Sequence, residues 1–341
     1  MHECQASAIY SICAPGLRCR LSPLGASIIS VEVPDAQGHF LNIALSPRNF
    51  EDGSAEPALA GRTIGPCCGR VRDGLITIDG RTYQLEKNEG ANHIHGGSSG
   101  CSQQIWTGKQ LSPTHVRFEL TLPDGAAGYP GNRLLRADYS VTENCLQAEY
   151  SAETDLPTWL GMTNHVYWDL SGRFDGSAME QLLEIAADQV VRNDAQHLPL
   201  SIVPAKQGAF DFSAPASPKS KLERYPEDTQ LRIGRGFNNF YILNEAMQRE
   251  RGFSARLASP HSGIRMTLQT DQPALVFYSG GFLDSQTRLQ SGGAIPGCAL
   301  ALEAQELPDP FHLPGSKARI LRPAEKWRRY IRWHFSREKE G

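Results

Sequence analysis

The chain has 341 residues, of which 40% are hydrophobic and 21% are charged, so it can bury a sizeable core and is not a disordered protein. Its net charge of −3 leaves no basic surface for nucleic acid or for an anionic membrane. No apolar run reaches the length of about eighteen residues that a membrane span needs, and residues 1–19 lack the pattern of a secretion signal. We expect a soluble, cytoplasmic protein without nucleic-acid or membrane partners.

The 8 cysteines do not form the short spacings of a zinc site. Their even number is compatible with disulfides, but the chain is long and lacks a secretion signal. Cys67 and Cys68 are adjacent, which is a poor geometry for a relaxed disulfide. We therefore expect reduced and mostly buried thiols.

Apolar and polar residues alternate in several segments, which is the pattern of a half-buried β-strand. In residues 27–33 the alternation places Ile29, Val31 and Val33 on one side. Residues 115–122 alternate over their whole length. Both segments are therefore predicted to be strands.

Three later segments complete the prediction in chain order. Residues 213–221 are rich in Ser, Pro and Lys and are expected to form a surface loop. Residues 244–251 are compatible with one short helix. In residues 327–335 the alternate positions are apolar except Arg329, which suggests a strand with a sheet margin or a long side chain reaching solvent at that point.

Turn-forming residues separate these segments, since the chain contains 32 Gly and 22 Pro. Many short strands joined by turns predict an all-β fold, either a sandwich or a barrel-like relative, with under about a tenth of the residues in helices. No repeat of fixed period interrupts the pattern. We predict a single domain over residues 1–341.

The first segment with chemical potential is Asn92-His93-Ile94-His95-Gly96-Gly97. Two glycines after His95 allow a backbone with positive φ that can present the imidazole at the rim of a pocket. A histidine in an ordinary turn explains this motif equally well when it is taken alone.

The second segment is Thr163-Asn164-His165-Val166-Tyr167. In a strand, His165 and Tyr167 project from the same face and could supply a polar group and a flat wall to one concave site. A histidine satisfied within the core is the alternative for this motif alone.

The third signal is Glu303, which follows the apolar run of residues 298–302. Strand parity places Glu303 on one face with Ala299 and Ala301, so there is room above it for a ligand. Because charged groups are almost never buried without a partner, this position is the strongest functional candidate. An ion pair with Arg70 is the structural alternative.

A glutamate and a histidine can act as base and acid near neutral pH when their surroundings adjust their pKa values. Such a pair can move a proton between two oxygens of one small molecule. Arg70 follows Gly69 in a glycine-rich segment, and its guanidinium has a fork of donors suited to sugar hydroxyls or carboxylates.

Together, these segments resemble the aldose 1-epimerase, or galactose mutarotase, family, in the same order along nearly the whole chain. The elements that carry the resemblance are Gly69-Arg70, Asn92 to Gly97, Gly128-Tyr129-Pro130-Gly131-Asn132, Thr163 to Tyr167, Leu302-Glu303-Ala304-Gln305 and Leu321-Arg322-Pro323. The resemblance implies a large antiparallel β-sandwich that binds a small-molecule sugar on its concave face, without a cofactor or catalytic metal.

The resemblance also implies roles for individual residues. Glu303 would take the proton of the anomeric hydroxyl while His165 protonates the ring oxygen, and the opened sugar would close to the other anomer. The resemblance further implies that five residues hold the sugar, namely Gly69, Arg70, His95, Tyr167 and Asn238. We expect Glu303 and His165 to lie on opposite sides of a sugar-sized space.

Two positions depart from the family pattern. Asn238 replaces the usual aspartate, and Val276 replaces a common glutamine. An amide forms weaker hydrogen bonds to hydroxyls than a carboxylate does, and valine forms none. These changes predict an altered sugar preference with the proton-transfer residues retained.

Three other functions compete with this hypothesis. The His93-x-His95 pair could bind a metal as in cupins, but the next acidic residue, Glu119, is far along the chain. A non-catalytic carbohydrate-binding or regulatory protein would not need both Glu303 and His165. A glycosidase would need a second carboxylate opposite Glu303. The preferred sugar and the oligomeric state do not follow from the sequence.

Overall fold

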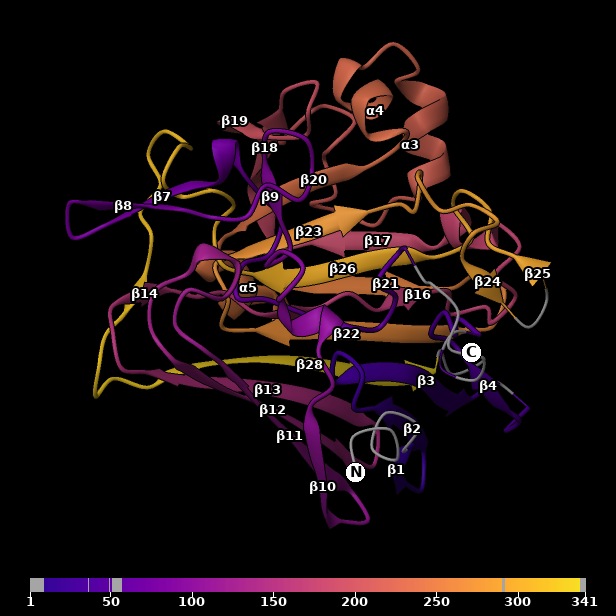
Figure 1. The fold of residues 1–341 in the computed structure, drawn as a ribbon. Coiled ribbons are helices and arrows are strands. Elements are labelled where there is room, and N and C mark those ends of the chain that lie inside the picture. Colours follow the sequence, from indigo (N-terminus) through magenta and orange to yellow (C-terminus); the bar gives the residue numbers. More distant parts are fainter. Residues whose placement is uncertain (1–8, 36, 49, 51–56, 290–291, 338–341) are drawn as a thin grey trace.

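The computed structural model describes residues 9–35, 37–48, 50, 57–289 and 292–337. Its three largest sheets are antiparallel and have eight, six and four strands (Figure 1). The predicted all-β antiparallel class is therefore confirmed.

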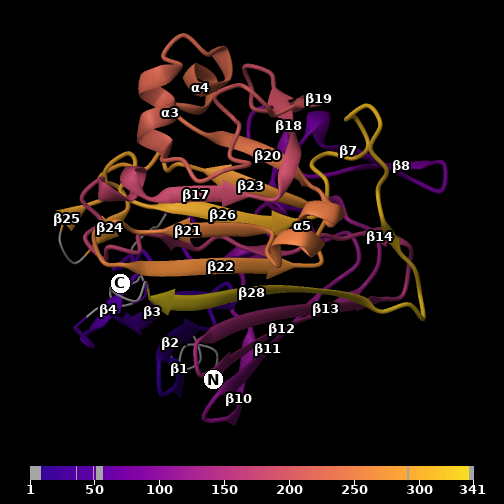
Figure 2. The same ribbon diagram turned by 180° about the vertical axis from the view of Figure 1, so that it is seen from behind.

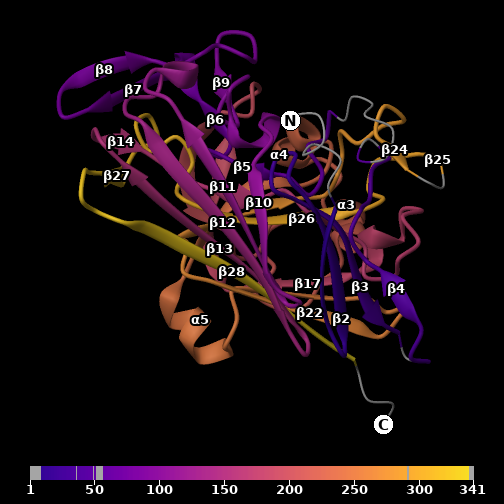
Figure 3. The same ribbon diagram turned by 60° about the horizontal axis from the view of Figure 1, so that its bottom comes forward.

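The eight-stranded sheet forms one side of the molecule, where β10 to β13 and β28 run side by side (Figure 3). The predicted strand of residues 115–122 coincides with one of its members. In spatial order its strands are β10 (Thr107–Ser112), β11 (His115–Leu122), β12 (Arg133–Thr142), β13 (Cys145–Thr154), β28 (Trp327–Arg337), β22 (Ile264–Thr270), β21 (Ala255–Ala258) and β17 (Leu182–Ile185).

The C-terminal strand β28 confirms the predicted alternation, with its apolar side chains buried. It lies between β13 and β22, but its pairing with β22 ends at Ile331, so Arg329 is paired only with β13 and the expected sheet margin is present there. The guanidinium of Arg329 pairs with Glu306 at 2.8 Å, which compensates its charge.

The six-stranded sheet carries Tyr167, Val276 and Glu303, and Asn238 begins another of its strands. In spatial order its strands are β16 (Tyr167–Trp168), β26 (Leu300–Gln305), β23 (Ala274–Tyr278), β20 (Asn238–Leu243), β18 (Ala187–Asn193) and β19 (Pro199–Pro204). The four-stranded sheet consists of β1 (Tyr10–Ala14), β2 (Leu17–Ser22), β3 (Ser27–Pro34) and β4 (Phe40–Asn42).

Short two-stranded ladders connect the large sheets. They pair β5 (Thr63–Ile64) with β15 (Thr163–Asn164), β6 (Arg70–Val71) with β9 (His93–Ile94), β7 (Leu75–Ile78) with β8 (Arg81–Gln84), β14 (Thr158–Trp159) with β27 (Ile320–Leu321), and β24 (Arg288–Leu289) with β25 (Gly292–Gly293).

One side-chain assignment in β3 is wrong. The register pairs Arg20 with Ser30 and Leu21 with Ile28, so Ile29 is an extra residue in a β-bulge. A bulge reverses the alternation of side chains. Consequently Ile28 joins Val31 and Val33 in the main core, whereas Ile29 lines a surface cavity.

The described helices are short, as predicted. They are α3 (Pro218–Arg224), α4 (Thr229–Gly234), α5 (Glu245–Arg251) and the 3₁₀ turns η1 (Arg72–Gly74), η2 (Cys101–Gln103), η3 (Ala126–Gly128) and η4 (Ser177–Glu180). In the view from behind, α3 and α4 lie together at one end of the molecule, away from α5 (Figure 2). None of the described helices is long and apolar enough to cross a membrane.

Two of these helices test the sequence prediction. The possible helix of residues 244–251 is present as α5, with the Asn244 side chain accepting from the backbone N–H groups that begin it. The loop predicted for residues 213–221 is wrong at its end, because α3 begins there. Ser217 caps this helix and Pro218 occupies its first position, which are the residues that favour a helix start.

The main apolar core lies between the large sheets. Successive side chains of β26 point alternately into this core and to the opposite face of the sheet. Leu300, Leu302 and Ala304 belong to the main core, whereas Ala299 and Ala301 belong to a second apolar cluster on the other face. The predicted parity around Glu303 is therefore confirmed.

The cysteines follow the expectation where the structure describes them. Seven are free thiols, and five of these are buried, including the adjacent Cys67 and Cys68. Cys4 lies outside the described residues.

Candidate active site

A cavity of about 540 Å³ lies over the face of the six-stranded sheet that carries Glu303. This volume is within the usual range for small-molecule sites. The cavity is lined by all of the residues nominated from the sequence, namely Gly69, Arg70, His95, His165, Tyr167, Asn238 and Glu303.

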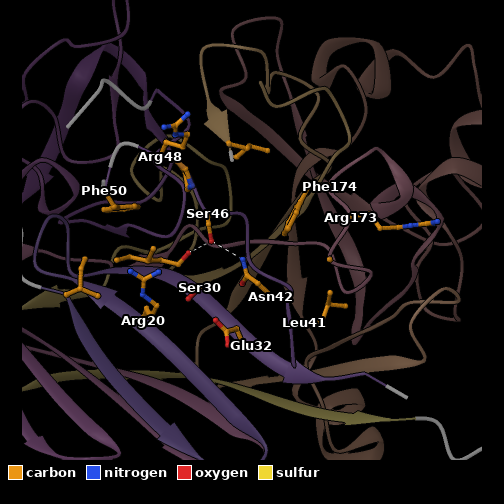
Figure 4. A pocket seen from close by; sticks show the side chains of 15 residues that line it. Arg20, Ser30, Glu32, Leu41, Asn42, Ser46, Arg48, Phe50, Arg173 and Phe174 are labelled. Atoms are coloured by element: carbon orange, nitrogen blue, oxygen red, sulfur yellow. Dashed lines mark hydrogen bonds between the residues drawn. The ribbon is translucent and has the colours of Figure 1, made fainter. Parts of the chain in front are cut away.

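A second cavity, of about 580 Å³, lies beside β2 and β3 and is lined by none of those residues (Figure 4). Its side chains include Arg20, Glu32 and Phe174, and the Ser46 hydroxyl is fixed by a hydrogen bond to the backbone oxygen of Ile29. Among the described residues that line it there is no histidine to pair with its carboxylate. The first cavity is therefore the candidate active site.

Glu303 in β26 and His165, which lies two residues before β16, are side by side. The register pairs Tyr167 of β16 with Ala301 of β26, and continuing it by two residues brings His165 next to Glu303. The His165 Nε2 atom is 3.7 Å from Glu303 Oε1. The expectation that the two groups face each other across a sugar-sized space is therefore wrong, because adjacent strands are separated by less than about 5 Å.

Burial shifts the pKa values of Glu303 and His165 in opposite directions. Glu303 is 4% exposed, and loss of hydration raises its pKa to about 8. Burial lowers the pKa of His165 to about 4, because it disfavours the charged imidazolium. At neutral pH the pair therefore holds one proton, on Glu303.

Aromatic contacts fix the orientation of the His165 ring. It stacks on Tyr167 with the centroids 4.8 Å apart, and it meets the edge of His95 at 5.8 Å. The Tyr167 hydroxyl donates to the backbone oxygen of Ala58 at 3.2 Å, which holds the Tyr167 ring in place.

His95 is presented to the cavity by a loop that needs glycine. His95 itself has a φ of 52°, and it is followed by positive φ values at Gly96 and Gly97. A Cβ atom on Gly96 would collide with the backbone oxygen of Gly65. The close backbone approach inferred from the two glycines is therefore present.

A hydrogen bond also fixes the tautomer of His95. The backbone N–H of Gly69 donates to His95 Nδ1 at 3.2 Å, so the hydrogen of the neutral ring is on Nε2. Burial and the neighbouring His165 lower the pKa of His95 well below its usual range, which keeps it neutral. His95 can therefore act as an N–H donor to an oxygen of a ligand.

Arg70 pairs with Glu89 and not with Glu303. Its Nε and Nη2 atoms donate to the two carboxylate oxygens of Glu89 at 2.6 and 2.7 Å. The sequence-based alternative of an Arg70–Glu303 ion pair is therefore wrong. Three of the five guanidinium N–H groups remain for other acceptors.

The two positions that depart from the family pattern line the cavity on strands β23 and β20. Val276 lies opposite Glu303 in the register and also pairs with Phe240 of β20. Asn238 lies one strand further from Glu303, in β20. The floor between Glu303 and Asn238 is therefore apolar.

The His93-x-His95 pair does not assemble a metal site. His93 is buried, its Nδ1 atom is 2.6 Å from the backbone oxygen of Glu86, and its Nε2 atom is 2.9 Å from the Tyr129 hydroxyl. Because β9 ends at Ile94, His95 turns into the cavity while His93 faces the interior. The extended segment that a cupin-like pair requires is absent from this described region.

Several residues of the cavity were not nominated from the sequence. They are Glu89, Asn193, His197, Phe282 and Gln305. Gln305 belongs to a family motif, and parity with Glu303 in β26 could have identified it. The others come from loops and strand ends, where no periodicity indicates the direction of a side chain.

Comparisons with known proteins identify the family of the chain. The model of the aldose 1-epimerase family matches residues 8–334. A galactose mutarotase from Rattus norvegicus is 30% identical over 92% of this chain and 89% of its own length. An aldose 1-epimerase from Escherichia coli is 29% identical over 95% of this chain and 93% of its own length.

Solved structures give the same result. An aldose epimerase homologue from C. elegans has a TM-score of 0.88 and 25% identity, covering 97% of this chain and 99% of its own. A galactose 1-epimerase from Lactobacillus acidophilus has a TM-score of 0.82 and 29% identity, covering 96% and 93% of the two chains. The chain thus belongs to the aldose 1-epimerase family and is an isomerase.

Proposed function

We propose that this protein interconverts the α and β anomers of a free aldose by proton transfer through Glu303 and His165. The observation that carries the proposal is a carboxyl and an imidazole 3.7 Å apart, with opposite pKa shifts, in a cavity of about 540 Å³. The family membership and the names of the relatives support the choice of substrate and reaction.

Ring opening requires one base and one acid. The Glu303 carboxylate takes the proton of the anomeric O1 hydroxyl, and the O1–C1 double bond forms as the bond from C1 to the ring oxygen O5 breaks. The His165 imidazolium gives its proton to O5. After rotation about the C1–C2 bond, O5 attacks the other face of C1 and both proton transfers reverse.

The pair carries one proton throughout this cycle. It is on His165 before ring opening and on Glu303 after it. The pKa shifts that burial causes favour the second distribution, which is the one that ring closure uses. Ring opening therefore needs sugar oxygens that hydrogen-bond to both groups and stabilise their ionised forms.

The remaining nominated residues would hold the sugar. The Nε2–H of His95 and the remaining N–H groups of Arg70 would donate to sugar oxygens, and the Tyr167 ring would pack against the sugar. Gly69 would act through its backbone, because its N–H sets the tautomer of His95. Asn238 would contact a hydroxyl far from the anomeric carbon.

Polarimetry tests the proposal directly. Purified protein is added to freshly dissolved α-D-galactose or α-D-glucose, and the approach to the equilibrium rotation is compared with that of buffer and of Glu303→Gln. We expect acceleration that depends on the concentration of wild-type protein. Sugar binding without acceleration would overturn the proposal in favour of a non-catalytic carbohydrate-binding protein.

A further inference from the structure

We propose that Glu89 sets the charge preference of the cavity: it holds the guanidinium of Arg70 and cancels its charge, so that the cavity selects uncharged aldoses over sugars that carry an anionic group. Glu89 acts through Arg70 and not on the reacting atoms, and it is therefore a positioning residue that determines specificity. The inference rests on the proposed function and deepens it, because it states the charge class of the substrate.

The pair of Arg70 and Glu89 is built by two segments that lie next to each other. Arg70 belongs to β6, and the register places it opposite Ile94 of β9. Glu89 begins the turn before β9, where its backbone N–H donates to the oxygen of Asn92 at 3.1 Å and its backbone oxygen accepts from the N–H of Asn92 at 3.0 Å. The backbone is therefore fixed on both sides of the bidentate contact, which joins Nε and Nη2 of Arg70 to the Glu89 carboxylate at 2.6 and 2.7 Å.

Both side chains are accessible to a ligand. They line the cavity, and the side chain of Arg70 is 21% exposed while that of Glu89 is 40% exposed. A sugar in the cavity can therefore approach the pair without a rearrangement of the protein. Because the pair is partly exposed, salt should weaken its effect on a charged ligand.

The charges around the cavity leave no net positive field for an anion. Arg70 is the only lysine or arginine among the described residues that line it, and two carboxylates, Glu89 and Asp284, line it as well. Glu303 and His165 share one proton at neutral pH and add no net charge. The two other histidines of the lining have lowered pKa values and are neutral. The described lining therefore carries an excess of negative charge.

His197, which also lines the cavity, lies within the fields of both members of the pair. Burial lowers its pKa and the charge of Arg70 lowers it further, whereas the charges of Glu89 and Asp194 raise it. The positive field of the guanidinium is thus opposed by the Glu89 carboxylate inside the cavity, and not only at the contact between the two side chains.

An anionic sugar would lose hydration on entering the cavity without gaining a cation in exchange. A guanidinium binds a carboxylate best through two parallel N–H groups, and Glu89 already occupies the Nε and Nη2 groups of Arg70. The three N–H groups that remain are suited to the oxygens of neutral hydroxyls. The arrangement therefore favours an uncharged sugar.

The experiment measures KM by polarimetry at pH 7 and low salt for D-galactose, D-galacturonate and D-galactosamine, which are neutral, anionic and cationic. Glu89→Gln keeps the size of the side chain and one acceptor for Arg70 but removes the charge. We expect the KM of galacturonate to fall about fivefold to tenfold and that of galactosamine to rise by a similar factor, while that of galactose changes less. In the wild type, added salt should bring the KM values of galacturonate and galactose closer together.

Two variants are the controls. Glu89→Asp keeps the charge and should keep the wild-type order of the three KM values. Asp79→Asn removes a carboxylate from another bidentate pair, with Arg322 at 2.8 Å, which does not line the cavity, and it should change none of the three. If Glu89→Gln changes all three KM values by one common factor, Glu89 only supports the structure and the inference fails. Unchanged KM values in Glu89→Gln would overturn it as well.

Titration calorimetry with the same sugars separates this inference from the proposed function. A wild-type protein that does not accelerate the equilibration of galactose beyond the rate of Glu303→Gln would overturn the proposed function. The ratio of the Kd values for galacturonate and galactose, compared between the wild type and Glu89→Gln, would still decide the role of Glu89. Turnover of galactose without any dependence of this ratio on Glu89 would overturn the inference and leave the proposed function intact.

Discussion

At the scale of single residues, Glu303 and His165 form a unit because each is buried and each is close to the other. Burial favours the neutral form of both, and the two groups are 3.7 Å apart. In the proposed function, one proton would pass between them through a bound sugar. Their protonation is therefore coupled, and kinetic pKa values will belong to the pair. Three predictions follow at this scale.

Glu303→Gln removes a proton acceptor with little change in volume. We predict a decrease in kcat of about a hundred- to ten-thousand-fold, the usual contribution of a positioned acid or base. Binding of galactose, measured by titration calorimetry, should change little. His165→Gln is the parallel variant and should show the same separation of turnover from binding, whereas activity near the wild-type level in either would contradict the assigned roles.

The pair needs one proton, so activity should have two limbs in its pH profile. As the pH rises through about 8, Glu303 loses its proton while His165 is already neutral, and no acid remains. As the pH falls through about 4, His165 is protonated while Glu303 is also protonated, and no base remains. The measurement is kcat/KM for galactose from pH 4 to 9, and a profile without an alkaline limb would be inconsistent with this account.

Asn238→Asp restores a charged acceptor on the far side of the cavity. Because a charge-assisted hydrogen bond is stronger than a neutral one, binding of galactose should tighten by about 1 kcal/mol. The KM of galactose and glucose measures this effect. Weaker turnover of both sugars would mean that the Asn238 amide donates to the natural substrate, which would then carry an acceptor such as a carboxylate.

At the scale of elements, strand register and tight loops place the side chains of the site. The β16–β26 register brings His165 to Glu303, and the loop after β9 brings His95 to His165. Periodicity in the sequence predicted the faces of β11, β26 and β28 because a strand alternates strictly. It failed at Ile29, since a bulge depends on the partner strand and leaves no mark in the strand's own sequence.

Gly96→Ala should test the loop after β9. A methyl group there collides with the backbone oxygen of Gly65, and the backbone φ is 84°. We predict a loss of about 1–3 kcal/mol in the free energy of unfolding, together with a higher KM because His95 is displaced. Gly80→Ala is the matched control, because it has a φ of 80° but nothing within 4 Å of the added Cβ. Equal losses in both variants would show that only φ matters.

At the scale of the whole molecule, the candidate site costs stability. Glu303 is buried, and no cation among the described residues lies at hydrogen-bonding distance from it, which the fold tolerates because the group is protonated at neutral pH. The free energy of unfolding therefore contains a term that depends on pH.

The sign of this term can be predicted. Folding raises the Glu303 pKa from its ordinary 4.5 to about 8, so this group favours folding at low pH and loses that contribution as the pH rises from 4.5 to 8. His165 acts in the opposite sense: folding lowers its pKa from 6.5 to about 4, so its contribution is lost as the pH falls through that range. Between pH 6.5 and 9, Glu303 is therefore the member of the pair whose titration changes the free energy of unfolding.

Urea unfolding at pH 6.5 and pH 9 measures this effect. The wild type should lose on the order of 2 kcal/mol relative to Glu303→Gln over this range. The comparison with the glutamine variant removes the contributions of all other titrating groups. A difference between the two proteins that does not change with pH would show that Glu303 is ionised in the folded protein at neutral pH.

The sequence by itself determined the fold class and nominated residues that all line one cavity, although most of the other lining residues were not predicted. Alternation fixed which side of a strand Glu303 and Tyr167 occupy, and paired glycines marked the loop that presents His95. These are local properties, because they depend on the geometry of a few consecutive residues. These features can therefore be predicted without knowing which strands pair with each other.

The tertiary structure decided which of these groups touch. It placed His165 beside Glu303, paired Arg70 with Glu89, and brought Asn193 and His197 to the same cavity. The pairing of β16 with β26 joins residues more than a hundred positions apart in the chain. Such pairings result from the packing of whole sheets around a common core, and an alternating sequence is compatible with many neighbours on either side.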